Sequence, residues 1–201
     1  MEKRPLLAID ATPLTLWFEG SAFLVAEKPR GMAVHPDGAD GRGTLVNALF
    51  QSNRWLAGME TSHLPGVVHV LRPDDRGLVL VAKTDAAWAQ LREAHRDGRI
   101  GFRFRVEMPA DVEPAAATPG GPVHVVGDRV YGGRRVVDVD TASGDSAALT
   151  AKWLGQRVEP AAVTWTCYGI ETPVPGEEWR STVALGERVA LPSLDVYSAP
   201  T

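Results

Sequence analysis

The 201-residue sequence is poor in cysteine, in lysine and in long hydrophobic runs. It has a single cysteine, Cys167, which excludes an internal disulfide and any metal cluster held by several cysteines. No hydrophobic run approaches the roughly 18 residues that a membrane span needs, and residues 1–5 lack the hydrophobic stretch of a secretory signal. We therefore predict a cytoplasmic protein with no membrane segment.

Positive charge is also scarce, and arginine carries most of it. The chain has 21 basic and 25 acidic residues, so its net charge of −4 would repel a polyanion. Binding of a nucleic acid would thus require a local cluster of cations. The densest such cluster along the chain consists of Arg92, Arg96, Arg99, Arg103 and Arg105. This cluster has two interpretations, a phosphate-contacting patch and a solvated face.

The composition predicts one globular domain over residues 1–201. The 20 glycines and 15 prolines indicate many turns and disfavour a helical bundle. Helices are expected from Thr44 and from Thr84 to Gly98, each with threonine as its N-cap, and a hairpin turn is expected at 127–133. Strands are expected at 22–27, 66–71, 78–82, 100–108, 134–139, 147–153, 162–168, 180–185 and 188–191. This pattern predicts an α+β fold with a mixed, largely antiparallel sheet and few helices.

The histidines do not suggest a metal site. None of them pairs with another at the spacing of metal ligands, so we expect no bound metal. The five are His35, His63, His69, His95 and His124. His69 follows two valines in a predicted strand, where a histidine is most often packed and hydrogen-bonded.

Four segments, in matching order, resemble motifs of the RluA-type pseudouridine synthases. They are residues 23–36 (family K-P-x-G and H-P), 43–49 (T-L-V-N-A-L), 65–78 (G-I-V-H-R-L-D-x-x-T-S-G-L) and 82–84 (A-K-T). Beyond residue 108 the resemblance is looser, with residues 144–150 similar to a G-K-x-A-x-T strand and 179–185 to an H-Q-I-R motif. The resemblance implies a synthase fold that acts without metal or cofactor on structured RNA, rRNA or tRNA, from which one uridine is flipped out.

The sequence departs from this family at its catalytic positions. With His69 and Gly77 as anchors, Arg72 stands where the family has its nucleophilic aspartate. A guanidinium stays protonated and offers only donors, so it can neither attack a sugar carbon nor accept a proton. Losing the nucleophile should raise the barrier by roughly 5 kcal/mol. The resemblance also places Phe102 on a family lysine, Phe104 on a tyrosine, and Thr182 on the arginine that pairs with the aspartate.

We therefore predict a synthase-like protein with no intact catalytic residue that retains RNA binding. The predicted RNA-binding residues are His69, Arg72, Arg76, Arg99, Arg103, Phe104 and Arg105. In this set Phe104 would stack on a base.

Two alternatives remain open at this point. In the first, the chain is an active synthase in which Asp74 or Asp75 supplies a displaced acid. The other interpretation of these two aspartates is a solvated turn with ion pairs to Arg72 or Arg76. In the second alternative, the chain is an interaction or scaffold domain that binds a protein or a small molecule and no RNA.

Overall fold

The computed structural model describes residues 11–36, 41–53, 56, 66–114, 123–154, 158–172 and 179–182. The chain divides into two compact units between Glu93 and Ala94. Unit 1 comprises the residues up to Glu93, and unit 2 comprises those from Ala94 onward. That residues 1–201 form a single domain stays a prediction.

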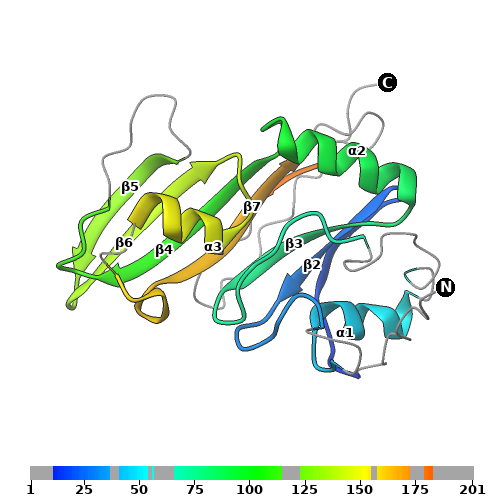
Figure 1. The fold of residues 1–201 in the computed structure, drawn as a ribbon, viewed down its shortest axis with the longest axis horizontal. Helices are drawn as coiled ribbons and strands as arrows, with labels where there is room; N and C mark the ends of the chain where they lie inside the picture. The colour runs from blue at the N-terminus through cyan, green and yellow to red at the C-terminus, as the bar shows by residue number, and fades with distance from the viewer. Residues whose placement is uncertain are drawn as a thin grey trace. The chain divides into compact units, whose positions relative to one another are not determined.

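Unit 1 contains three antiparallel strands in chain order, β1 (Leu16–Glu19), β2 (Phe23–Lys28) and β3 (Arg76–Ala82) (Figure 1). Strand β2 pairs with β3 along its whole length, from Phe23 opposite Ala82 to Lys28 opposite Gly77. Every residue of β3 after Arg76 is buried, as expected for a continuous hydrophobic run. The predicted strands at 22–27 and 78–82 are confirmed. The strand predicted at 66–71 is wrong, because this segment contributes only an isolated bridge between Val67 and Val81.

Threonine caps start both long helices, as predicted. Helix α1 (Leu45–Ser52) begins with a reciprocal capping box, in which the Thr44 side chain accepts a hydrogen bond from the Asn47 backbone and the Asn47 side chain accepts one from the Thr44 backbone. Helix α2 (Asp85–Arg96) begins where the Thr84 hydroxyl accepts from the Ala87 N–H at 3.1 Å. Gly98, with φ of +69°, follows its last turn.

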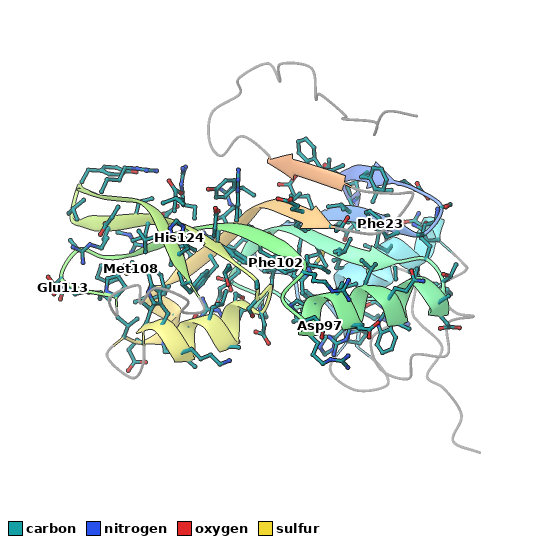
Figure 2. The ribbon with its side chains drawn as sticks, turned by 90° about the horizontal axis from the view of Figure 1, so that it is seen from above. Phe23, Asp97, Phe102, Met108, Glu113 and His124 are labelled. Carbon is teal, nitrogen blue, oxygen red and sulfur yellow. The ribbon has the colours of Figure 1, made fainter. Side chains whose placement is uncertain are left out.

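Unit 2 is an antiparallel sheet in the order β8–β7–β4–β6–β5. Its strands are β4 (Gly101–Pro109), β5 (His124–Tyr131), β6 (Arg134–Thr141), β7 (Thr164–Thr172) and β8 (Trp179–Thr182). Central strand β4 alternates as predicted: Phe102 and Met108, labelled in Figure 2, are buried with Phe104 and Val106.

The other expectations for unit 2 have mixed outcomes. The strands predicted at 134–139 and 162–168 are confirmed as β6 and β7, and β8 confirms residues 180–182 of the strand predicted at 180–185. The strand predicted at 188–191 lies outside the described residues. The hairpin turn predicted at 127–133 is confirmed only at Gly132 and Gly133, whose φ values of +57° and +75° fit a two-residue type I′ turn. Residues 127–131 belong to β5 instead.

The strand predicted at 147–153 is wrong. Residues there form α3 (Ser146–Leu149) and the π-helical turn η2 (Thr150–Leu154), and a 3-10 turn, η4 (Pro160–Ala162), follows. The Asp145 carboxylate accepts hydrogen bonds from the Ala147 and Ala148 N–H groups, both at 3.0 Å, and this N-cap favours a helix over a strand. The α+β class with a mixed, largely antiparallel sheet and few helices is nevertheless confirmed.

Candidate functional site

The turn that precedes β3 holds Arg72 in one orientation. The Arg72 guanidinium donates from Nε to Oδ2 of Asp75 at 2.8 Å and from Nη2 to Oδ1 at 3.0 Å. The backbone N–H of Asp75 donates to the carbonyl oxygen of Arg72 at 3.1 Å and closes the turn. The Asp75 side chain is fully buried, and the Arg72 side chain is 17% exposed. A bidentate pair of this kind combines charge attraction with a planar geometric fit.

The same contacts decide how the two aspartates of this turn are interpreted. The predicted ion pair between Arg72 and Asp75 is confirmed. The expectation of a solvated turn is wrong for Asp75, which is fully buried, and holds for Asp74, which is exposed. Both carboxylate oxygens of Asp75 accept from Arg72, so Asp75 is poorly placed to act as an acid or a nucleophile.

The Lys28 side chain binds backbone carbonyl groups of this turn, although Lys28 is not among the predicted site residues. Its fully buried Nζ donates to the carbonyl oxygens of Met32 and Asp75, both at 2.6 Å, and also contacts those of Pro29 at 3.0 Å and Pro73 at 3.2 Å. An ammonium has three protons, so these four acceptors share them. Lys28 thereby joins the loop after β2 to the loop before β3.

Burial sets the protonation behaviour of Lys28. Desolvation lowers the pKa of its ammonium from 10.5 to about 8, and the charge of nearby Arg30 lowers it further, while Asp75 and Asp74 oppose this shift. The signals in the sequence are a lysine that ends a hydrophobic strand just before Pro29 and its place in the K-P-x-G motif of residues 23–36.

His69 is a packed residue. It is 2% exposed, and its Nε2 lies 3.2 Å from the carbonyl oxygen of Leu78, a contact in which Nε2 carries the proton. Side chains of α2 hold the same segment: Trp88 donates to the Val67 carbonyl at 3.2 Å and Arg92 to the Val68 carbonyl at 3.1 Å. These contacts favour the structural interpretation of His69, and the use of Arg92 in packing removes it from the free cations.

Most of the predicted RNA-binding arginines are already paired with carboxylates. In unit 1, Arg76 is exposed at the first position of β3. In unit 2, Arg99 contacts Asp97 at 3.3 Å and Arg103 contacts Asp140 at 3.3 Å. The positive charge expected around residues 92–105 is therefore largely compensated by neighbouring aspartates.

The best-defined of these pairs involves Asp138. Arg105 binds it with two hydrogen bonds, of 2.7 and 3.1 Å, and Arg129 adds a third at 3.0 Å. Burial alone would raise the pKa of Asp138, but the hydrogen bonds and the charges of Arg105 and Arg129 together outweigh burial and lower that pKa below its usual value.

Phe104 does not provide the predicted stacking surface. Its side chain is fully buried, with the Trp165 ring 5.4 Å away edge-on and the Phe102 ring 6.3 Å away. A base could reach the Phe104 ring only if β4 left the core of unit 2. The physical reason is the alternation of β4, which turns Phe104 inward and Arg103 and Arg105 outward.

No group of three or more histidine, cysteine, aspartate or glutamate side chains in the described ranges could hold a metal ion. Nor does this part of the chain contain a helix that is both long and apolar enough to cross a membrane.

Thr182, which the family resemblance places on an arginine position, lies on β8 and pairs with Gly169 of β7.

The chain is similar in sequence to several RNA pseudouridine synthases. It is 43% identical over 94 residues to the ribosomal large subunit pseudouridine synthase D of Zymomonas mobilis, which covers 46% of this chain and 30% of that protein. It is 42% identical over 78 residues (39% and 26%) to the uncharacterized RNA pseudouridine synthase YlyB of Bacillus subtilis, and 27% identical over 154 residues (76% and 46%) to one from Aquifex aeolicus. The matches thus span less than half the length of these curated relatives.

Solved structures of the same class share the fold. The human RNA pseudouridylate synthase domain containing 4 matches with a TM-score of 0.52 at 13% identity, over 85% of this chain and 88% of that chain. Human RNA pseudouridylate synthase domain containing 1 matches with a TM-score of 0.51 at 15% identity, over 87% of this chain and 84% of that chain. No family model matches the chain. The predicted synthase-like fold is confirmed, and the relatives support a relation to the pseudouridine synthases.

Proposed function

We propose that this chain is a pseudouridine synthase-like protein that binds structured RNA and does not carry out the aspartate-dependent isomerisation. The observation that carries this proposal is the state of Arg72. It stands at the position of the family's nucleophile, and two hydrogen bonds of 2.8 and 3.0 Å hold it on a buried carboxylate.

The chemistry of this turn supports the loss of the covalent step. Attack on a sugar carbon needs a group with an available electron pair, which a guanidinium lacks. Asp75 could offer one, but it is fully buried and both its oxygens are engaged by Arg72. Asp74 remains as an exposed carboxylate in the same turn, so the displaced-acid alternative reduces to this residue.

The relatives support RNA as the partner. The names of some of them specify RNA, and the names of others specify the ribosomal large subunit. We extend this partner class to the present chain as rRNA or tRNA, bound in the cytoplasm without metal or cofactor. Arg76 of the predicted set is exposed at the first position of β3, beside the turn, where a phosphate can reach it.

An activity assay tests the loss of catalysis. Purified protein is incubated with unmodified transcripts of rRNA fragments and tRNA, and pseudouridine is quantified by mass spectrometry, with an active pseudouridine synthase on the same RNA as positive control. We expect no pseudouridine above background, together with measurable binding of the RNA. Formation of pseudouridine would contradict the proposal, and its loss in Asp74→Asn would then identify the displaced acid.

The binding arm separates RNA from other partners. An absence of RNA binding even at low salt, where phosphate contacts are strongest, would contradict the proposal and favour the scaffold alternative.

A further inference from the structure

The tip of the β5–β6 hairpin carries an exposed aromatic side chain, that of Tyr131. Tyr131 is 67% exposed and is the most exposed large hydrophobic side chain among the described residues. Gly132 and Gly133 follow it in the turn, and a Cβ on either glycine would meet no atom within 4 Å, so the turn itself is open to solvent. Phe104, the aromatic residue expected to meet a base, is by contrast fully buried.

The strand register places two arginines on the same face as Tyr131. Tyr131 lies directly opposite Arg134 in the antiparallel pair, so their side chains share a face of the sheet. Arg129 lies two residues before Tyr131 on β5 and therefore points to that face as well. Strand β5, which begins at His124 (Figure 2), is the edge strand of unit 2, so the hairpin is covered on one side only.

This hairpin is locally basic in an acidic protein. Residues 128–135 contain Arg129, Arg134 and Arg135 against Asp128, a formal charge of +2, whereas the whole chain carries −4. Arg129 is bound to Asp138 at 3.0 Å and Arg135 to Asp128 at 3.3 Å. No carboxylate of the described residues pairs with Arg134, so its charge is available to an anion.

We propose that the hairpin tip is an RNA contact, in which Tyr131 stacks on an unpaired base and Arg134 contacts an adjacent phosphate. This inference rests on the proposed function and names the part of the RNA that the chain recognises. A base stacks on an aromatic ring through its π-face, which every base has, so the contact is tolerant of sequence. Arg134 supplies the charge complementarity that an isolated exposed tyrosine would lack.

A second copy of the chain is the competing occupant of this surface. An exposed edge strand can pair with another edge, but β5 has features that oppose this. Asp128 and Arg129 place charges on the strand, and the pairing with β6 is irregular between Val125 and Gly127. These features favour a side-chain contact at the tip over pairing along the edge.

The test compares two RNA probes and four variants of the full chain by fluorescence anisotropy. The probes are a stem–loop with an unpaired uridine-rich loop and a fully paired duplex of the same length. We expect Tyr131→Ala to weaken binding of the stem–loop about tenfold and to leave binding of the duplex unchanged. Tyr131→Phe, which keeps the ring, should bind like the wild type. Arg134→Gln should weaken both complexes and reduce the dependence of log Kd on log salt by about one.

Val130→Ala is the matched control. Val130 is 52% exposed on the same hairpin but lies opposite Arg135, on the other face, so its truncation should leave binding unchanged. If the wild type binds the stem–loop and Tyr131→Ala binds it equally well, the hairpin contact is wrong and the proposed function stands. If the wild type binds neither probe, both fail. A dimer in sedimentation that Tyr131→Ala dissociates, with unchanged RNA affinity, would also overturn the proposal. Thermal unfolding of each variant checks that the fold is intact.

Discussion

At the scale of single residues, the candidate site is defined by two cations that the sequence treats very differently. Arg72 draws attention because the family resemblance predicts an aspartate at its position, whereas Lys28 matches the family K-P-x-G motif and ends a predicted strand. In the structure both serve the same turn: Arg72 holds the side chain of Asp75 and Lys28 holds its backbone carbonyl at 2.6 Å. The position of each cation therefore depends on an anion or a carbonyl placed by the fold.

The Arg72–Asp75 pair should be strongly coupled. Arg72→Ala leaves a fully buried carboxylate without its guanidinium, and we expect it to lower the free energy of unfolding by about 3 kcal/mol. The double variant Arg72→Ala, Asp75→Ala should lose less than the sum of the single variants. Urea denaturation of the four proteins of this double-mutant cycle measures the coupling. Additive losses would show that the two side chains act independently.

Lys28 should make stability depend on pH in the alkaline range. The folded pKa of about 8 lies below the unfolded value of 10.5, so below about pH 8 both states bind the proton and the full cost of burying the ammonium is present. Between these values the unfolded state binds more protons, and the contribution of Lys28 to stability rises with pH. Relative to Lys28→Met, the wild type should gain about 2 kcal/mol between about pH 7 and about pH 10 in urea denaturation. A difference that stays flat across this range would contradict the lowered pKa.

At the scale of elements, the site depends on how closely the segment before it approaches β3. The carbonyl oxygen of Gly66 accepts from the Ala82 N–H at 2.7 Å, and the Val68 N–H donates to the Leu80 carbonyl at 3.1 Å. Gly66 has φ of +69°, and a Cβ there would collide with the carbonyl oxygen of Ala82. The residue must be glycine for both conformational and steric reasons.

Two glycine substitutions separate the cost of backbone strain from the cost of the steric collision. Gly31 also has a positive φ, of +84°, but a Cβ there would meet no atom within 4 Å. Gly31→Ala should therefore cost only the left-handed backbone strain, about 1 kcal/mol. Gly66→Ala adds the backbone collision and should cost about 3 kcal/mol or more. Thermal unfolding measures both, and equal losses would show that the approach of Gly66 to β3 is not rigid.

Element prediction succeeded where local signals were strong. The alternation of 102–108 and the caps Thr44 and Thr84 are visible in sequence, and each produced the expected strand or helix. The segment 147–153 failed because its hydrophobic residues suit a strand as well as a helix. The sequence contains the Asp145 cap. The contact that holds this segment in place is a hydrogen bond of 2.9 Å from the Trp165 indole to Thr150, and Trp165 comes from a distant strand whose position local patterns do not predict.

At the scale of the whole molecule, most of the arginines predicted to bind RNA are paired with aspartates in the described part of the chain. The chain is acidic overall, and Arg72, Arg99, Arg103 and Arg105 each lie against an aspartate. Binding of RNA would therefore neutralise few phosphates and release few counterions.

The dependence of RNA affinity on salt measures this directly. We expect log of the association constant to fall against log salt with a slope of about −2, corresponding to about three phosphate contacts. Anisotropy titrations of a stem–loop RNA at several salt concentrations give the slope. A slope steeper than about −5 would indicate many phosphate contacts over a broad basic surface. That result would contradict the inference that these paired arginines do not bind phosphate.

The sequence by itself determined the fold class, the two capped helices and the alternation of β4, and it predicts that Arg72 stands at the position where the family resemblance expects an aspartate. These follow from local periodicity, from caps and from the order of short motifs, all of which act over a few residues. Only the tertiary structure decided that Asp75 is buried under Arg72, that Lys28 joins two loops, that Phe104 faces the core and that Tyr131 faces solvent. Burial and ion pairing depend on which distant segments meet, and a side chain of the same type can be packed or exposed according to that meeting.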